Sequence, residues 1–118
     1  MADKKRLDRL AQQLRTELDA LIESEIDDPR VDMVRVTRVR VSNDMRYARV
    51  YVNTLGSDGE RASALEGLDS AKGFLRRQLS HRLGHLKRTP ELRFDYDESV
   101  EKEMRIEELL AQIDSEER

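Results

Sequence analysis

The sequence has no cysteine, no tryptophan, two prolines and only five aromatic residues among its 118 positions. Without cysteine there is no disulfide framework, thiol nucleophile or zinc–thiolate site. No apolar run approaches the length of a signal peptide or a membrane span, so we expect a soluble cytoplasmic protein with no membrane partner. A chain of this length forms one domain, and its core must be aliphatic and thin.

Charge is abundant but unevenly distributed, since 40% of the residues are charged while the net charge is only −3. Residues 1–32 carry 6 basic and 9 acidic side chains. Residues 33–88 carry 12 basic and 5 acidic ones, and residues 89–118 carry 4 and 11. A basic middle between acidic ends indicates an anionic partner for the middle, with flanks that limit indiscriminate binding.

Hydrophobic periodicity predicts a first amphipathic helix over residues 4–26, which Asp28 and Pro29 end. Two strands follow, at residues 33–42 and 47–53, joined by a hairpin turn at residues 43–46. The alternation of valines in the first strand changes parity, which predicts a β-bulge near Thr37 and Arg38.

Residues 57–88 contain the most distinctive pattern. Ser57 and Glu60 form a capping box that opens a helix, and Gly73 weakens that helix further along. We therefore expect a break at Ala71, Lys72 and Gly73, followed by a basic helix that extends to Arg88. Its apolar stripe consists of four leucines, at positions 75, 79, 83 and 86.

The chain continues with a third strand at residues 91–97 and a last helix, for which Ser99 is the expected N-cap. We predict an α+β fold in the order α-β-β-α-kink-α-β with a C-terminal helix, and with the helices packed on one face of a three-stranded sheet. Residues 1–113 form the single domain, and residues 114–118 form a short acidic tail.

The segment from position 76 to position 88 carries five basic residues, two histidines and no acidic residue. A single-sign run of this length favours binding of a polyanion through phosphate contacts, although it does not separate RNA, DNA and an acidic protein. The candidate binding residues are Lys72, Gly73, Arg76, Arg77, His81, Arg82, His85, Lys87 and Arg88, with Arg46 from the hairpin turn.

Other patterns have simpler explanations. His81 and His85 have the spacing of a metal pair, but no third ligand stands nearby, so we expect no metal. Gly56-x-x-Gly59 matches the G-x-x-G motif of KH domains, but the capping box explains it better. Tyr47 and Tyr51 lack the surrounding RNP1 pattern, so packing is the favoured role for both.

No arrangement of residues indicates catalysis. Asp95 and Asp97 share a strand face, but a carboxylate pair without a pocket or partner is usually an ordinary part of the protein surface. No nucleophile–base pair or phosphate-cradling loop is present in the sequence. We expect no enzymatic activity, no cofactor and no small-molecule substrate.

Several segments together resemble the ribosome-binding factor A family. They are Asp28-Pro29-Arg30-Val31, the hairpin at 36–52, Leu55-Gly56, residues 71–76 and residues 90–97, and the resemblance runs from about Leu7 to about Leu110. It implies a KH-like fold of the second type, in which an alanine-x-glycine kink at positions 71–73 replaces the G-x-x-G corner.

The resemblance also implies a function. Family members associate with the free small (30S) ribosomal subunit, contact 16S ribosomal RNA, support its late maturation and end processing, matter for growth in the cold and have no catalytic activity. We expect a monomer. Two other functions stay open: a general KH-type protein that binds single-stranded RNA, and a module that docks an acidic protein through the basic helix.

Overall fold

A computed structural model describes residues 3–54 and 57–116. The elements follow the order α1 (Lys4–Glu25), η1 (Pro29–Val31), β1 (Arg35–Val41), β2 (Tyr47–Asn53), α2 (Asp58–Arg82), β3 (Glu91–Tyr96) and α3 (Ser99–Glu116). β2 lies between β1, its antiparallel partner, and β3, its parallel partner. Parallel neighbours need a crossover, and α2 supplies it. The predicted α+β class, with its hairpin and third strand, is confirmed.

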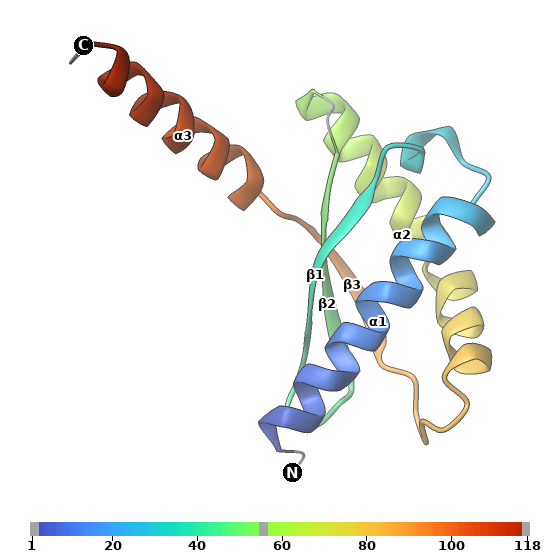
Figure 1. Ribbon diagram of the computed structural model, residues 1–118. Coiled ribbons are helices and arrows are strands. Elements are labelled where there is room, and N and C mark those ends of the chain that lie inside the picture. Colours follow the sequence, from blue (N-terminus) through green and yellow to red (C-terminus); the bar gives the residue numbers. More distant parts are fainter. Residues whose placement is uncertain (1–2, 55–56, 117–118) are drawn as a thin grey trace.

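α1 and α2 cover one face of the sheet, and the other face is left open (Figure 1). Leucines on the inner sides of both helices interdigitate with valines that point inward from the strands, as the alternation of the sequence predicts. The fully buried large side chains are Leu14, Leu18, Leu21, Val31, Val50, Val52, Leu68, Leu75, Leu79, Pro90 and Leu92. The core is therefore aliphatic, as expected.

The hairpin contains the predicted bulge. The register of β1 against β2 shifts between Val36 and Arg38, which leaves Thr37 as the extra residue. The Thr37 hydroxyl donates to the Asp97 carboxylate at 2.6 Å, so the bulge aims this side chain at the end of β3. The turn at residues 43–46 places Met45 at φ 60°, in the left-handed region.

α2 differs from the expected pair of helices. Its helical hydrogen bonding continues through Ala71, Lys72 and Gly73, and the ribbon changes direction near its middle without breaking (Figure 1). The helix also ends at Arg82 rather than Arg88, because Leu83 leaves helical geometry at φ −113° and ψ 52°. Ser57 caps the start of α2 as predicted, since its hydroxyl oxygen accepts from the Glu60 amide at 3.4 Å. Leu55 and Gly56 lie outside the described residues.

The glycine that close packing requires is Gly67. A Cβ atom there would lie 2.9 Å from Val31 Cγ1 and 3.2 Å from Arg30 Cβ, so Gly67 lets η1 approach α2. At Gly73 a Cβ atom would meet only Arg77 Nη1, at an ordinary 3.5 Å.

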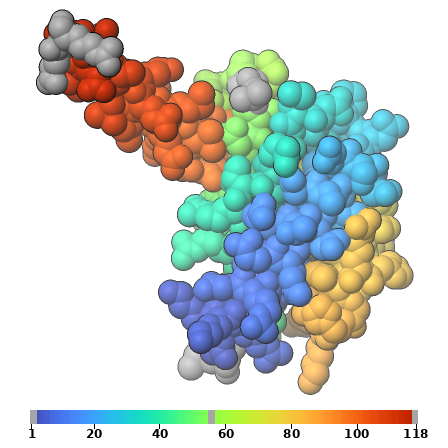
Figure 2. All heavy atoms as spheres, in the orientation of Figure 1, coloured from blue at the N-terminus to red at the C-terminus, as the bar shows by residue number. Residues whose placement is uncertain are grey.

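α3 stands clear of the packed body (Figure 2), and the part of it that the structure describes buries no residue. The expectation that all helices gather on one face of the sheet is therefore wrong for α3. Five large hydrophobic side chains remain about half exposed along it: Met104, Ile106, Leu109, Leu110 and Ile113. No helix among the described residues is long and apolar enough to cross a bilayer.

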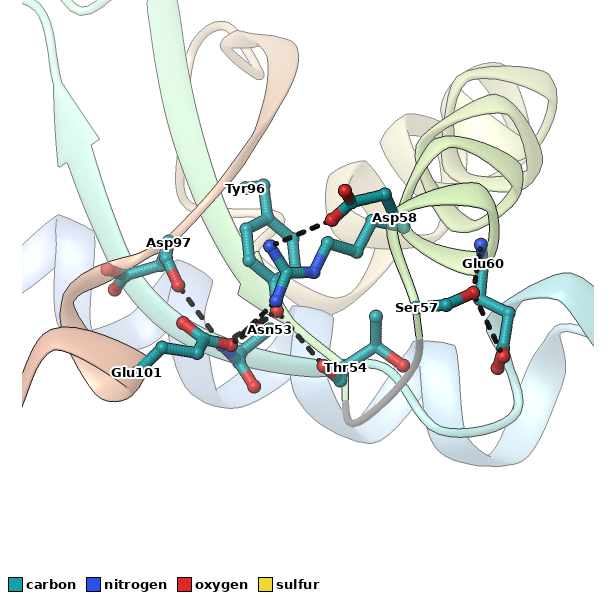
Figure 3. Close-up of polar contacts among 9 residues, drawn as sticks. Asn53, Thr54, Ser57, Asp58, Glu60, Tyr96, Asp97 and Glu101 are labelled. Atoms are coloured by element: carbon teal, nitrogen blue, oxygen red, sulfur yellow. Dashed lines mark hydrogen bonds and ion pairs between the residues drawn. The ribbon is translucent and has the colours of Figure 1, made fainter. Parts of the chain in front are cut away.

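Polar contacts fix the N-terminal end of α3 against the ends of β2 and β3 (Figure 3). The Asn53 amide donates to the Asp97 carbonyl at 3.0 Å and to Glu101 Oε1 at 2.9 Å. The Tyr96 hydroxyl lies 2.7 Å from Glu101 Oε1 and 3.0 Å from the Thr54 carbonyl oxygen. The end of β2 thereby fixes the direction in which the chain leaves β3.

Asp97 and Ser99 occupy different roles from those expected. Asp97 is buried rather than at the surface, and it accepts hydrogen bonds from the backbone and hydroxyl of Ser99 at 3.0 and 2.6 Å. Ser99 is the first residue of α3, not the cap before it. A carboxylate that accepts from the first turn of a helix is stabilising there.

Candidate nucleic-acid interface

A groove opens at the end of the molecule where α1 begins, the β1–β2 turn lies and the chain leaves α2. This hairpin-end groove has a volume of about 600 Å³, and its lining consists of Arg6, Arg9, Leu10, Gln13, Asp44, Met45, His85, Leu86, Lys87 and Arg88. Leu10, Met45 and Leu86 belong to the core or pack against it, whereas the basic residues are exposed. The groove therefore combines an apolar floor with a basic rim.

The end of α2 builds one wall of the groove. The Leu83 amide donates to the Leu79 carbonyl at 2.8 Å, and the Leu86 amide donates to the Leu83 carbonyl at 3.0 Å. Leu83 and Leu86 remain against the core while the chain turns through Gly84. This turn carries Lys87 and Arg88 to the side of α1, where the first turns of that helix supply Arg6 and Arg9.

The groove favours anions. Its lining holds two arginines of α1 together with Lys87 and Arg88, against a single carboxylate, Asp44. Hydrogen bonds from the Ser42 hydroxyl and the Arg46 amide, both to Asp44 Oδ1, hold the pKa of Asp44 below the usual range. This carboxylate therefore stabilises the turn. The excess of guanidinium and ammonium groups suits phosphate oxygens.

The structure divides the ten predicted binding residues. His85, Lys87 and Arg88 line the groove, and Arg46 is exposed in the turn beside Met45. Arg77, His81 and Gly73 are exposed on α2. The three that remain have partners within the protein, and these are Lys72 with Asp69 at 2.9 Å, Arg82 with Glu17 at 3.1 Å, and Arg76 with the Thr89 carbonyl at 2.9 Å.

The helical face on which this set was predicted is shorter than expected. Because α2 ends at Arg82, His81 lies on the helix while His85 lies in the following turn. The two histidines therefore do not share one helical face. His85 and Arg88 reach the interface through the loop geometry, not through helical periodicity.

Sequence reasoning missed Arg6 and Arg9. Both lie on the exposed side of α1, where charged residues are ordinary, and their local signal is the basic cluster at positions 4, 5, 6 and 9. Only the packing of α1 beside the residues that follow α2 brings them to the groove.

Comparison with known proteins decides the family. The model of the family described as "Ribosome-binding factor A" matches residues 6–110. The chain belongs to the ribosome-binding factor A family. The ribosome-binding factor A of Thiobacillus denitrificans is 48% identical over 102 residues, which cover 86% of this chain and 82% of that protein.

Solved structures of ribosome-binding factor A agree with this fold. The crystal structure from Thermus thermophilus superposes with a TM-score of 0.68 at 30% identity, covering 76% of this chain and 94% of that one. A homology model of the Thermus thermophilus ribosome-binding factor A, fitted into a cryo-EM map of a 30S–RbfA complex, has a TM-score of 0.61 at 30% identity. The match covers 75% of this chain and 91% of the homology model. The matched region of the ribosome-binding factor A family includes every residue of the hairpin-end groove.

Proposed function

We propose that this chain is a non-enzymatic ribosome assembly factor. It binds the free 30S subunit through 16S ribosomal RNA, supports late maturation and RNA end processing, and acts as a monomer with residues 1–113 as its binding domain. The observation that supports this most is the family match over residues 6–110. The fitting of a Thermus thermophilus family member into a 30S complex map supports the choice of partner.

The proposed contact surface is the hairpin-end groove together with the exposed Arg77 and His81 of α2. Phosphates bind the basic rim and displace counterions, so affinity falls steeply with salt. Lys72 and Arg82 can also bind phosphate with little loss of stability. Their partly exposed ion pairs within the protein contribute little, and a phosphate replaces the carboxylate.

Such binding acts on RNA folding through differential affinity. A factor that binds one conformation of immature RNA better than the alternatives raises the population of that conformation. It supplies no chemical step. Maturation then follows from which RNA conformation the nucleases and later factors meet.

The test is sedimentation with purified small subunits at low and moderate salt. The pair Arg77→Glu/Arg88→Glu should abolish co-migration while circular dichroism stays unchanged, because both side chains are exposed. The matched control is Lys102→Glu/Arg105→Glu, two exposed charges on α3, which should bind like the wild type. Absence of the wild-type protein from the small-subunit fraction at both salt concentrations would contradict the function.

Two rival functions give different outcomes in the same experiment. A general binder of single-stranded RNA prefers short oligonucleotides over the intact subunit. A docking module for an acidic protein does not migrate with ribosomal particles at all. An assembly factor binds the intact subunit more tightly than any isolated oligonucleotide of its RNA.

A further inference from the structure

The uncovered face of the sheet carries a row of arginines. Because Ala48, Val50 and Leu92 point into the core, Arg49 and Arg93 point to the opposite side. The register pairs Arg40 of β1 with Arg49 of β2, and Arg49 with Arg93 of β3. Three like charges therefore lie side by side on three neighbouring strands. With strands about 4.8 Å apart, the row spans about 10 Å.

This arrangement opposes folding. Like charges directly opposite one another destabilise a sheet, whereas opposite charges in the same positions stabilise it. Among the described residues, Asp95 offsets part of this positive charge, because its Oδ2 lies 3.3 Å from Arg49 Nε. A bound anion would remove the remaining repulsion.

Two tyrosines flank the row. Tyr47 and Tyr51 lie two residues either side of Arg49 on β2, and they share its face. The Arg93 guanidinium lies 4.5 Å from the centre of the Tyr47 ring, and the Arg38 guanidinium lies 4.2 Å from that of Tyr51. Arg38 and Arg93 are themselves exposed. Both aromatic rings and guanidinium planes are surfaces on which unstacked bases pack.

The row and the rings surround one shallow hollow of about 430 Å³, lined by Arg40, Val41, Ser42, Asn43, Tyr47, Arg49, Tyr51 and Arg93. We propose that this open sheet face is a second binding surface, and that its ligand is single-stranded RNA. The arginine row binds phosphates while bases stack against Tyr47 and Tyr51. The proposal rests on the proposed RNA-binding function but uses a different surface from the hairpin-end groove.

A single strand fits better than the alternatives. A duplex hides its base faces, so the tyrosines would gain no contact from it. A peptide of Asp and Glu would pair with the arginines but has no aromatic bases to stack on the tyrosine rings. The hairpin turn also joins the two surfaces, because Ser42 and Asn43 line the open-face hollow and Asp44 and Met45 line the hairpin-end groove. One strand passing around the turn would contact both surfaces.

The test uses a labelled ten-nucleotide oligouridine and the full chain, with affinity read by fluorescence anisotropy at several salt concentrations. Tyr47→Leu/Tyr51→Leu should weaken binding about 10- to 100-fold, since each stacked base contributes substantially. Arg40→Gln should weaken it less and lower the salt slope by about 1. Arg105→Gln on α3 is the matched control, and it should bind like the wild type.

Intrinsic fluorescence gives a second measurement. The chain has three tyrosines and no tryptophan, so stacked bases should quench its emission on binding, and the double tyrosine variant should lose that quenching. Unchanged RNA affinity in the double tyrosine variant overturns the proposal, as does an oligoglutamate peptide that binds this face as tightly as oligouridine.

Co-sedimentation with 30S subunits separates this inference from the function on which it rests. If the open-face variants retain oligouridine binding while the groove variants lose the subunit, the inference fails and the assembly function stands. If the wild-type chain binds oligouridine, the double tyrosine variant loses that binding and neither binds the subunit, the assembly function fails and the open face stands. Circular dichroism of each variant checks that the sheet is intact.

Discussion

Thr37 and Asp97 lie 60 positions apart, yet the Thr37 hydroxyl donates to Asp97 Oδ2 at 2.6 Å. The bond joins the bulge of β1 to the end of β3, across the central strand. Asp97 also accepts from the backbone and hydroxyl of Ser99. One buried carboxylate thus connects the hairpin, the third strand and the start of α3.

We expect Asp97→Ala to lower the free energy of unfolding by about 2 kcal/mol, because it removes a buried carboxylate together with its hydrogen bonds from Thr37 and Ser99. Urea denaturation monitored by circular dichroism measures the change. Asp95→Ala is the matched control on the same strand, where an exposed ion pair with Arg49 should contribute no more than about 0.5 kcal/mol. Equal losses in the two variants would contradict this role of Asp97.

Acid should weaken the same junction. Hydrogen bonds from Ser99 and Thr37 hold the pKa of Asp97 below the usual range. A carboxyl with a lowered folded-state pKa adds stability that is fully present above its unfolded value, about 3.9, and is lost as pH falls through the folded value. The difference in unfolding free energy between wild type and Asp97→Asn should therefore shrink below about pH 4. A constant difference between neutral and strongly acidic pH would show that Asp97 does not titrate as inferred.

Gly67 and Gly73 of α2 should respond oppositely to alanine. Gly67→Ala places a Cβ atom 2.9 Å from Val31 Cγ1, and overpacking of this kind costs about 1–3 kcal/mol of stability. Gly73→Ala meets only ordinary contact and should stabilise the helix by up to about 1 kcal/mol. Thermal unfolding of both variants measures this. A destabilised Gly73→Ala variant would show that the bend of α2 depends on that glycine.

Asn53 should control the attachment of α3. Asn53→Ala removes the donor shared by the Asp97 carbonyl and Glu101 Oε1, while the body of the protein stays packed. We expect faster amide hydrogen exchange over residues 100–104 with little change in α1. Asn43→Ala, an exposed turn residue, is the control. Unchanged exchange at the N-terminal end of α3 would mean that Tyr96 and Glu101 hold the helix without Asn53.

Much of the candidate site is visible in local patterns, and the misses have identifiable causes. The basic character of residues 76–88 is a property of composition, so it can be read directly. The extent of the helix cannot, because the end of α2 depends on Leu83 and Leu86 remaining against the core while the chain turns toward β3. Local pattern favours packing for Tyr47 and Tyr51, since nothing near them in the chain shows that their sheet face lacks a covering layer.

Local patterns in the chain are enough to establish the order of elements, the bulge at Thr37, the aliphatic core and the basic middle. These features follow from periodicity, parity and composition, which act between residues that are near one another. Folding in three dimensions was needed to bring Arg6 and Arg9 beside Lys87 and Arg88 around one groove and to align three arginines across the sheet. It also made Gly67, not Gly73, the close contact. Those relationships depend on strand register and helix packing, which join residues far apart in the chain and leave no local pattern.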